Sequence, residues 1–340
     1  MRAAVFDAER NVVNIETMQD LRPGADELLV KVCRCGICAT DVAMTSGDST
    51  FKFGSGRIGH EYSGEVIEVG RNVRTHKTGD KIAAMPVIGC GACETCNRGN
   101  PLLCAAQTSA MFGFGEFAVI PPKNAVRLPN SLSFADGALV EPMACGLHAM
   151  RLARLEPGSR VLVIGAGVMA LAAIFWARRL GAGRIAVLSR SAHRREMAMI
   201  MGADAVLSFE PDDQVRVSEV LGGKPDIVAE CVGKPGMIGL AVDHVRAGGS
   251  VLAMGLCMQA ESILPIRYNF SEVRLLFPIG YTADEFEATA RAFDAGRVRI
   301  EVMVSDVIAL DALPMRLEAM RNSSGGMKVQ VDLAGTFHRD

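Results

Sequence analysis

The chain has 340 residues, more than a single hydrophobic core usually supports, so we expect two domains. Hydrophobic residues make up 49% and charged residues 22% of the sequence, and the net charge of −2 lacks the basic surplus of a nucleic-acid-binding protein. The first residues, MRAAVFDAERNVV, lack the apolar stretch of a secretory signal, which leads us to expect a cytoplasmic protein. Residues 161–177 form a long apolar run without a charge, but Gly165 and Gly167 divide it into a short strand and a helix, so we expect no membrane span.

Four residues from three separate segments could together hold a catalytic zinc ion. They are Cys38 in CGICATD, His60 and Glu61 in IGHEYSG, and Glu141 in LVEPMACG. One thiolate, one imidazole and one carboxylate leave a fourth zinc position open for water or a substrate oxygen, as a catalytic site requires. The sequence leaves open whether Glu61 or Glu141 is the third ligand. Each residue alone is weak evidence, because a lone cysteine is usually part of a core and a lone His–Glu pair usually lies on the surface.

Four further cysteines crowd into residues 89–105 and predict a second zinc ion: Cys90, Cys93, Cys96 and Cys104. Two-residue gaps allow consecutive thiolates to converge on one tetrahedral cation, and four thiolates leave no open position, so this zinc should be structural. The alternative is four independent reduced cysteines. The remaining cysteines are expected to pack as small hydrophobic side chains, although the first two could face one metal: Cys33, Cys35, Cys145, Cys231 and Cys257.

From residue 160 onward, short β-rich runs alternate with stretches of helical periodicity, which predicts a parallel sheet wound on both sides. The first turn follows a strand and opens a helix. It runs through Gly165, Gly167, Val168 and Met169, and Ala170 stands where the dinucleotide-binding fingerprint allows glycine or alanine. The backbone N–H groups of such a turn face a pyrophosphate, so we expect a dinucleotide site.

The next predicted strand ends at Ser189, where an NAD-binding unit would carry an acidic residue for the ribose. Here Arg190 and Arg194 follow instead and can bind a 2′-phosphate. They could also be a solvated helix start, but cations are disfavoured at that end of a helix. The segment therefore favours NADP over NAD.

The order of these motifs resembles the zinc-containing medium-chain dehydrogenase/reductase family of alcohol, polyol and threonine dehydrogenases. The segments that carry the resemblance are CGICATD at 35–41, GHEYSGEV at 59–66, the four-cysteine stretch, EPMACGLHA at 141–149 and VIGAGVMA at 163–170. The resemblance implies an α/β protein with a GroES-like β-rich catalytic domain, residues 1–146 and 283–340. Residues 147–282 would form a Rossmann domain with a doubly wound parallel sheet that binds NADP. Relatives often pair through sheet edges of the cofactor domain, which implies a homodimer or homotetramer.

The resemblance also implies roles for single residues. The expected ligands of the catalytic zinc are Cys38, His60 and Glu141, with Glu61 as a close or exchanging carboxylate. Thr40 would take the substrate proton, and Asp41 would orient the ring of His60, although either could simply cap a helix start.

Two positions depart from the family, and a third has two possible roles. Ala43 stands where many relatives have a histidine that passes the proton to solvent, so the relay should end in the cofactor ribose or in water. Gly280 stands before Tyr281 where sorbitol-type relatives have an arginine, which argues against a highly hydroxylated substrate. Lys328 either approaches the cofactor phosphates, as in relatives, or is a solvated surface charge.

The predicted function is a zinc-dependent oxidoreductase that transfers a hydride between NADP(H) and a secondary alcohol or its ketone. Five apolar residues expected near the substrate cleft suit an aliphatic or aromatic substrate, or else only pack their loops: Met44, Phe51, Phe53, Met111 and Phe112. A polyol dehydrogenase of the sorbitol or butanediol type, or an amino-alcohol dehydrogenase, is the alternative within the enzyme class. An NADPH-binding protein with a structural or redox-sensing role is the alternative outside it.

Overall fold

The computed structural model describes residues 1–46, 54–191, 194–294, 300–321 and 327–335. They form two compact units. The first joins Met1–Glu141 to C-terminal residues from Tyr281 onward, and the second comprises Pro142–Gly280. No helix in these ranges is both long and apolar enough to cross a membrane.

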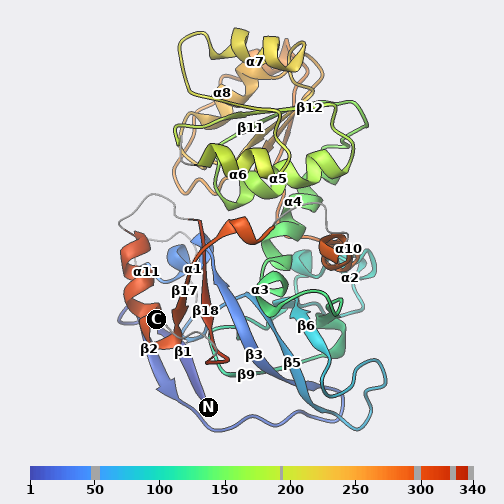
Figure 1. The fold of residues 1–340 in the computed structure, drawn as a ribbon, viewed down its shortest axis with the longest axis vertical. Helices are drawn as coiled ribbons and strands as arrows, with labels where there is room; N and C mark the ends of the chain where they lie inside the picture. Colours follow the sequence, from blue (N-terminus) through green and yellow to red (C-terminus); the bar gives the residue numbers. More distant parts are fainter. Residues whose placement is uncertain (47–53, 192–193, 295–299, 322–326, 336–340) are drawn as a thin grey trace. The chain divides into compact units, whose positions relative to one another are not determined.

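The first unit is mainly β-structure. Its strands are β1 (Arg2–Asp7), β2 (Val12–Thr17), β3 (Leu28–Ile37), β4 (Gly56–Arg57), β5 (Glu61–Val69), β6 (Lys81–Ala84), β7 (Val87–Ile88), β8 (Thr108–Ser109), β9 (Phe117–Ile120), β10 (Ala125–Arg127), β17 (Val304–Ala309) and β18 (Lys328–Asp332). Its largest sheet has the order β10-β6-β5-β3-β18-β17, with β9 also paired to β3, and a smaller sheet has the order β2-β1-β4. Strand β18 from the C-terminal end lies antiparallel to β3 from the N-terminal end, so the two ends of the chain share one sheet (Figure 1).

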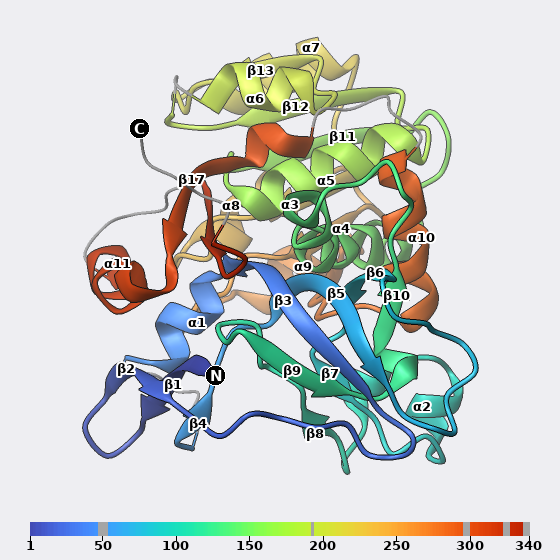
Figure 2. The same cartoon turned by 60° about the horizontal axis from the view of Figure 1, so that its bottom comes forward.

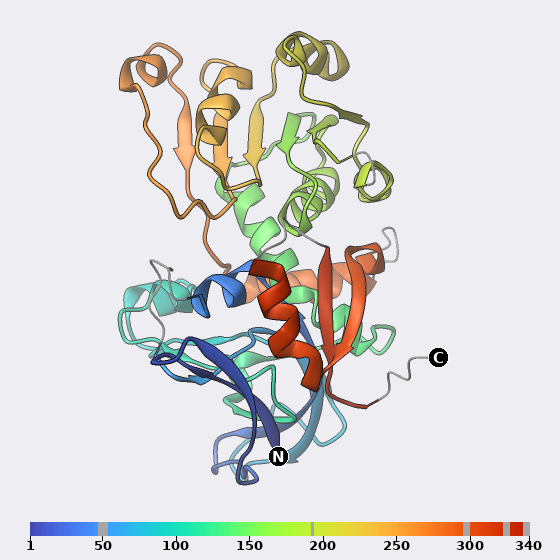
Figure 3. The ribbon, with the colours of Figure 1, turned by 90° about the vertical axis from the view of Figure 1, so that its left-hand side faces the viewer.

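Short helices connect these strands. They are α1 (Ala39–Met44), α2 (Glu94–Asn97), α3 (Phe134–Gly137), α10 (Ala283–Asp294) and α11 (Leu313–Arg321), with 3-10 turns η1 (Pro101–Leu103), η2 (Pro122–Asn124), η4 (Ile300–Met303) and η5 (Leu310–Ala312). Figure 2 shows β3, β5 and β9 side by side, and Figure 3 shows α11 beside the C-terminal strands. The core between the sheets is formed by residues that include Phe6, Leu28, Tyr62, Ile82, Phe114 and Val331.

Strand β3 is the centre of this unit and leads directly to the candidate metal site. Its sequence LLVKVCRCGI is rich in β-branched and aliphatic residues, and most of them are buried. The pairing register with β5 shifts twice, between Leu29 and Val30 and between Val32 and Arg34. Beyond the second shift Gly36 pairs with Glu61, so the end of β3 meets the beginning of β5.

The second unit contains a six-stranded sheet in the order β13-β12-β11-β14-β15-β16, and all of its neighbouring strands are parallel. The strands are β11 (Arg160–Ile164), β12 (Arg184–Leu188), β13 (Ala205–Leu207), β14 (Ile227–Glu230), β15 (Ser250–Ala253) and β16 (Arg274–Leu276). The helices are α4 (Val140–Leu152), which begins in the first unit, α5 (Val168–Arg179), α6 (Arg195–Ile200), α7 (Asp213–Leu221), α8 (Met237–His244) and α9 (Pro265–Asn269).

Strand order in this sheet reverses at β11. The chain proceeds from β11 through β12 to β13 on one side and continues with β14 on the other. In open parallel sheets ligands bind beyond the carboxyl ends of the strands at such a reversal. The turn from Gly165 to Gly167 follows β11 at this point, as the sequence predicts for a dinucleotide site.

Candidate metal and cofactor sites

Three of the predicted ligands of a catalytic zinc converge in the first unit. Cys38 follows β3 directly, His60 immediately precedes β5, and Glu61 is the first residue of β5. One ligand atom from each residue lies within 4.8 Å of the other two. His60 and Glu61 are buried, whereas Cys38 is partly exposed. The group can therefore surround a cation and leave one side open.

Two hydrogen bonds to the carboxylate of Asp41 hold this group together. Its Oδ1 lies 3.1 Å from Nδ1 of His60, and its Oδ2 accepts a hydrogen bond of 2.8 Å from the backbone N–H of Cys38. Burial alone would lower the pKa of His60, but the Asp41 charge and the hydrogen bonds that the ring makes to Asp41 and Cys38 raise it above its usual value. Thr40 lies on the same short helix, with its Oγ1 3.5 Å from Sγ of Cys38.

Glu141, the alternative carboxylate ligand, lies in the first turn of α4. It is not among the three converging residues, but its charge interacts with those of His60 and Glu61. Desolvation is the main cause that raises the pKa of Glu141 to about 7; the charge of His60 opposes it most, and a hydrogen bond from Tyr281 opposes it less. No motif in the sequence points to the contact between Tyr281 and Glu141.

Lys328 is not a solvated surface charge, because its ammonium group is buried and hydrogen-bonded. The residue is 4% exposed, and Nζ donates to Oε1 of Glu61 at 2.6 Å and to the carbonyl of Ile37 at 3.0 Å. Burial alone would lower the pKa of Lys328, but the neighbouring charges of Glu61 and Cys38 raise it. The surface-charge interpretation is therefore wrong, since the antiparallel pairing of β18 with β3 buries this strand end.

The other oxygen of Glu61, Oε2, is buried and has no hydrogen-bond partner among the described residues. A buried carboxylate oxygen without a partner is costly unless a donor or a cation satisfies it. Together with a thiol and an imidazole, this oxygen completes a donor set that suits zinc. The residues present therefore fit the metal that the sequence predicts.

The four-cysteine stretch forms the second group of possible metal ligands. Sulfur atoms of Cys90, Cys93, Cys96 and Cys104 all lie within 4.8 Å of one another, and Cys104 is buried while Cys90 is exposed. Several hydrogen bonds lower the pKa of Cys93 to about 6, and the one with Thr95 has the largest effect. Four mutually close sulfurs suit a tetrahedral zinc with no open position.

The glycine-rich turn of the second unit has the geometry of a phosphate-binding loop. Gly165 has a φ of +110°, which only glycine adopts readily, and Gly167 is the residue before α5. A Cβ atom placed on Gly167 would meet nothing within 4 Å, so the start of α5 faces open space. Val168 and Met169 form the first turn of this helix. Space beside free N–H groups fits the pyrophosphate of a dinucleotide.

Ser189 directly follows β12, as predicted, and accepts a hydrogen bond of 3.1 Å from the backbone N–H of Ser191. Arg190 is exposed, and its guanidinium carbon lies 5.7 Å from the ring centre of Phe209. Arg194 is partly exposed and precedes α6. No acidic residue stands at the end of β12, the position from which a carboxylate would repel a 2′-phosphate.

The residues expected to edge a substrate cleft have mixed placements. Met44 is buried, and Phe112 packs against the core with Arg57 4.9 Å above its ring, so both contribute to packing. Met111 is partly exposed. Phe51 and Phe53 lie outside the described residues.

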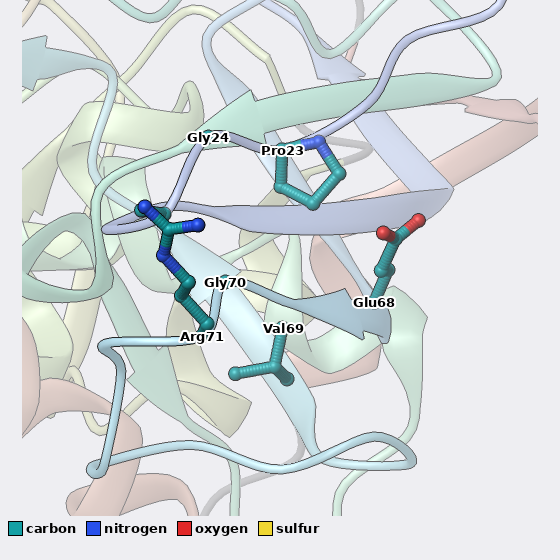
Figure 4. A pocket seen from close by; sticks show the side chains of 7 residues that line it. Pro23, Gly24, Glu68, Val69, Gly70 and Arg71 are labelled. Carbon is teal, nitrogen blue, oxygen red and sulfur yellow. The ribbon is translucent and has the colours of Figure 1, made fainter.

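A surface pocket of the first unit lies away from these groups (Figure 4). It is lined by Pro23, Gly24, Ala25, Glu68, Val69, Gly70 and Arg71. Glu61 and Val69 are the two ends of β5, and eight residue steps of extended chain span roughly 26 Å. The pocket is therefore not part of the candidate metal site.

Comparisons with known proteins agree with this arrangement. The model of the alcohol dehydrogenase GroES-like domain matches residues 24–130, and the model of zinc-binding dehydrogenases matches residues 168–295. Sorbitol dehydrogenase of Bacillus subtilis (strain 168) is 29% identical over 342 residues, which cover 97% of each chain. A zinc-type alcohol dehydrogenase-like protein of Escherichia coli (strain K12) is 31% identical and covers 84% of this chain and 85% of its own.

Among solved structures, a zinc-binding dehydrogenase from Sinorhizobium meliloti 1021 bound to NADP has a TM-score of 0.87 and 30% sequence identity. The match covers 98% of this chain and 99% of the other.

Proposed function

Because the chain belongs to the zinc-containing medium-chain dehydrogenase family, we propose that it transfers a hydride between NADP(H) and a secondary alcohol or its ketone. The predicted fold class, a GroES-like domain with a Rossmann domain, is confirmed, as is the enzyme class, a zinc-dependent alcohol dehydrogenase. Membership of an enzyme family sets aside the non-catalytic alternative. For the domains, we propose residues 1–146 and 283–340 as the catalytic domain and residues 147–282 as the cofactor domain.

The convergence of Cys38, His60 and Glu61 within 4.8 Å is the observation that carries the proposal. These residues, with Glu61 or Glu141 as the carboxylate, would hold the catalytic zinc. When bound, zinc would act as a Lewis acid that lowers the pKa of an alcohol and polarises a carbonyl, and NADP would accept or return the hydride.

The protein's own residues would orient the reactants and move the proton. Thr40 lies on α1 with its hydroxyl group beside the sulfur of Cys38, and this hydroxyl would accept the proton of the alcohol. Asp41 fixes the ring orientation of His60 through its hydrogen bond to Nδ1. Ala43 cannot relay a proton, so the proton must leave Thr40 through the cofactor ribose or water.

A second zinc in the cysteine group 90–104 would be structural, which gives two zinc ions per chain. At the cofactor site, the turn from Gly165 to Met169 would bind the pyrophosphate, and Ser189, Arg190 and Arg194 would bind the ribose and its 2′-phosphate. The absence of an acidic residue at the end of β12 supports NADP over NAD, and so does the NADP bound to the structural neighbour.

A secondary alcohol without further hydroxyl groups is the substrate class that we favour. Gly280, before Tyr281, offers no cation to a hydroxylated chain, and Tyr281 itself hydrogen-bonds to Glu141. A polyol is the second candidate, because sorbitol dehydrogenase is among the relatives.

We also propose that the protein forms a homodimer or homotetramer through the edge of its parallel sheet. Strand β16 is one of the two edge strands of this sheet, with β13 at the other edge. Large apolar side chains flanking it are exposed: Leu264, Ile266, Phe270, Phe277 and Ile279. Exposed apolar side chains beside the open edge of a sheet favour association with another chain. Light scattering of the wild type and of Phe277→Glu would test this, and a monomeric wild type would exclude it.

Zinc counting and a substrate panel test the proposed function together. Wild-type protein should hold two zinc ions per chain. With NADP it should oxidise secondary alcohols faster than polyols, and it should oxidise secondary alcohols faster with NADP than with NAD. Cys38→Ser should lose one zinc ion and nearly all turnover. Cys257→Ser, which changes a partly exposed thiol outside both groups, should keep both. Wild-type activity in Cys38→Ser would refute the proposed site.

A further inference from the structure

The proposed hydride transfer assigns no role to the ion pair between Lys328 and Glu61. Both residues are buried, at 4% and 0% exposure, and Nζ lies 2.6 Å from Oε1. A buried ion pair is costly to desolvate and is weak evidence of a stabilising role. Its position at one ligand of the candidate metal site therefore calls for a different explanation.

Backbone pairing fixes the position of this lysine. Strand β18 runs antiparallel to β3, and Val329 pairs with Ile37. Lys328 is thus held beside the end of β3, and this strand ends at Ile37, one residue before Cys38. Its second hydrogen bond, to the carbonyl of Ile37, locks Nζ in this place.

The backbone at Gly36 also confines the carboxylate of Glu61. A Cβ atom on Gly36 would collide with Oε2 of Glu61 and would lie 3.1 Å from Cδ of Lys328. Only a glycine leaves room for both side chains. Oε1 is thus occupied by the ammonium group, and Oε2 is the oxygen without a partner among the described residues.

We propose that Lys328 is a positioning residue that limits Glu61 to a single oxygen toward the metal. The inference rests on the proposed function, since it concerns the zinc site of Cys38, His60 and Glu61. A carboxylate with both oxygens free can bind a cation through both. Bidentate binding would fill the position that a catalytic zinc keeps open for substrate. Lys328 prevents this because it holds Oε1 away.

Cobalt(II) in place of zinc reports the number of ligands, because its visible absorption weakens as coordination rises from four to five. Lys328→Met removes the ammonium group, so Glu61 should become bidentate and the visible bands should lose intensity. The metal should be retained, because the site becomes more negative. Turnover should fall by roughly 10- to 100-fold, the usual cost of losing a partner of a metal ligand. Lys328→Leu should behave alike, and Lys328→Arg should restore the wild-type spectrum.

Arg34→Met is the matched control. Arg34 forms an ion pair with Asp332 across the same two strands, β3 and β18, and both side chains are mostly buried. This variant should lower stability but leave the cobalt spectrum unchanged. Cys38→Ser provides the blank, because its spectrum comes from the four-cysteine group alone.

The outcomes separate the two hypotheses. If Cys38→Ser has the same spectrum as the wild type, no metal binds at Cys38, and the proposed function and the role of Lys328 both fail. If the Cys38-dependent bands are present but identical in Lys328→Met and Lys328→Leu, the proposed function stands and the role of Lys328 is refuted. The same conclusion follows if Arg34→Met changes the bands as much as Lys328→Met does.

Discussion

Asp41 hydrogen-bonds to His60 at 3.1 Å while its second oxygen binds the backbone N–H of Cys38 at 2.8 Å. One carboxylate thereby orients two of the proposed zinc ligands. An amide in its place can accept only through one atom, so Asp41→Asn should disturb one of the two contacts. We expect a loss of roughly 10- to 100-fold in zinc affinity or kcat, measured by chelator titration and steady-state kinetics.

Asp136→Asn is the control for this variant. Asp136 occupies the corresponding position in α3, where Oδ2 accepts from the backbone N–H of Ser133 at 2.8 Å. It should cost a similar amount of helix capping, about 1 kcal/mol, without affecting zinc. If both variants lose zinc equally, Asp41 acts as a helix cap only.

Gly36 gives a second prediction, on the space beside Glu61. In Gly36→Ala the new methyl group would collide with Oε2 of Glu61. Overpacking of this kind typically costs about 1–3 kcal/mol, and displacement of the carboxylate should also reduce zinc content at the site. Thermal unfolding and metal analysis would measure both effects. Gly239→Ala in α8, where a Cβ meets nothing within 4 Å, should keep its zinc and its stability; a Gly36→Ala protein with normal zinc content would contradict the prediction.

The zinc ligands could be predicted from the sequence, whereas the lysine beside them could not. Thiol, imidazole and carboxylate form a recognised zinc donor set, so the sequence predicts that Cys38 and His60 share a metal with either Glu61 or Glu141. The structure brings Glu61 into this group. Lys328 was not linked to them, since 267 residues separate it from Glu61 and only the pairing of β18 with β3 joins them. Local motifs reveal chemistry, whereas contacts between distant strands depend on a register that the sequence does not display.

The parallel sheet was more accessible to prediction. Its central strands are largely buried and read as apolar runs, such as RVLVI in β11. Ser189 and Arg190 could be placed at a strand end for that reason. The exposed phenylalanines near β16 were not predicted, because an apolar residue in sequence looks the same whether it is buried or at a surface.

Arg190 gives a third prediction, on cofactor choice. Arg190→Asp places a carboxylate at the end of β12, where it should repel the 2′-phosphate of NADP. Hydrogen bonds to charged groups contribute about 1.5–3 kcal/mol, so kcat/KM for NADP should fall by at least about 10-fold while that for NAD does not fall. Arg184→Asp changes an exposed arginine at the opposite end of the same strand and should affect neither cofactor. Unchanged NADP kinetics in Arg190→Asp would exclude a contact with the phosphate.

Asp226 gives a prediction for acid stability of the parallel-sheet unit. It accepts hydrogen bonds from the backbone N–H and Nε of Arg160, at 2.8 and 3.2 Å, and from Nε of Arg246 at 2.6 Å. Burial alone would raise the pKa of Asp226, but these hydrogen bonds outweigh it and lower the pKa to about 2. A carboxylate whose pKa is lower in the folded state adds stability above its unfolded pKa, near 4, and this stability is lost as the pH falls toward 2.

Asp226→Asn should therefore unfold at a lower urea concentration than the wild type at pH 7, and the difference should shrink steadily between pH 5 and pH 3. Asp212→Asn is the control, because Asp212 is exposed and its oxygen lies 4.0 Å from Arg216, a pair that contributes little. Its unfolding should match the wild type throughout. A wild-type advantage over Asp226→Asn that is as large at pH 3 as at pH 7 would show that the stabilisation comes from neutral hydrogen bonds and packing, not from the charge of Asp226.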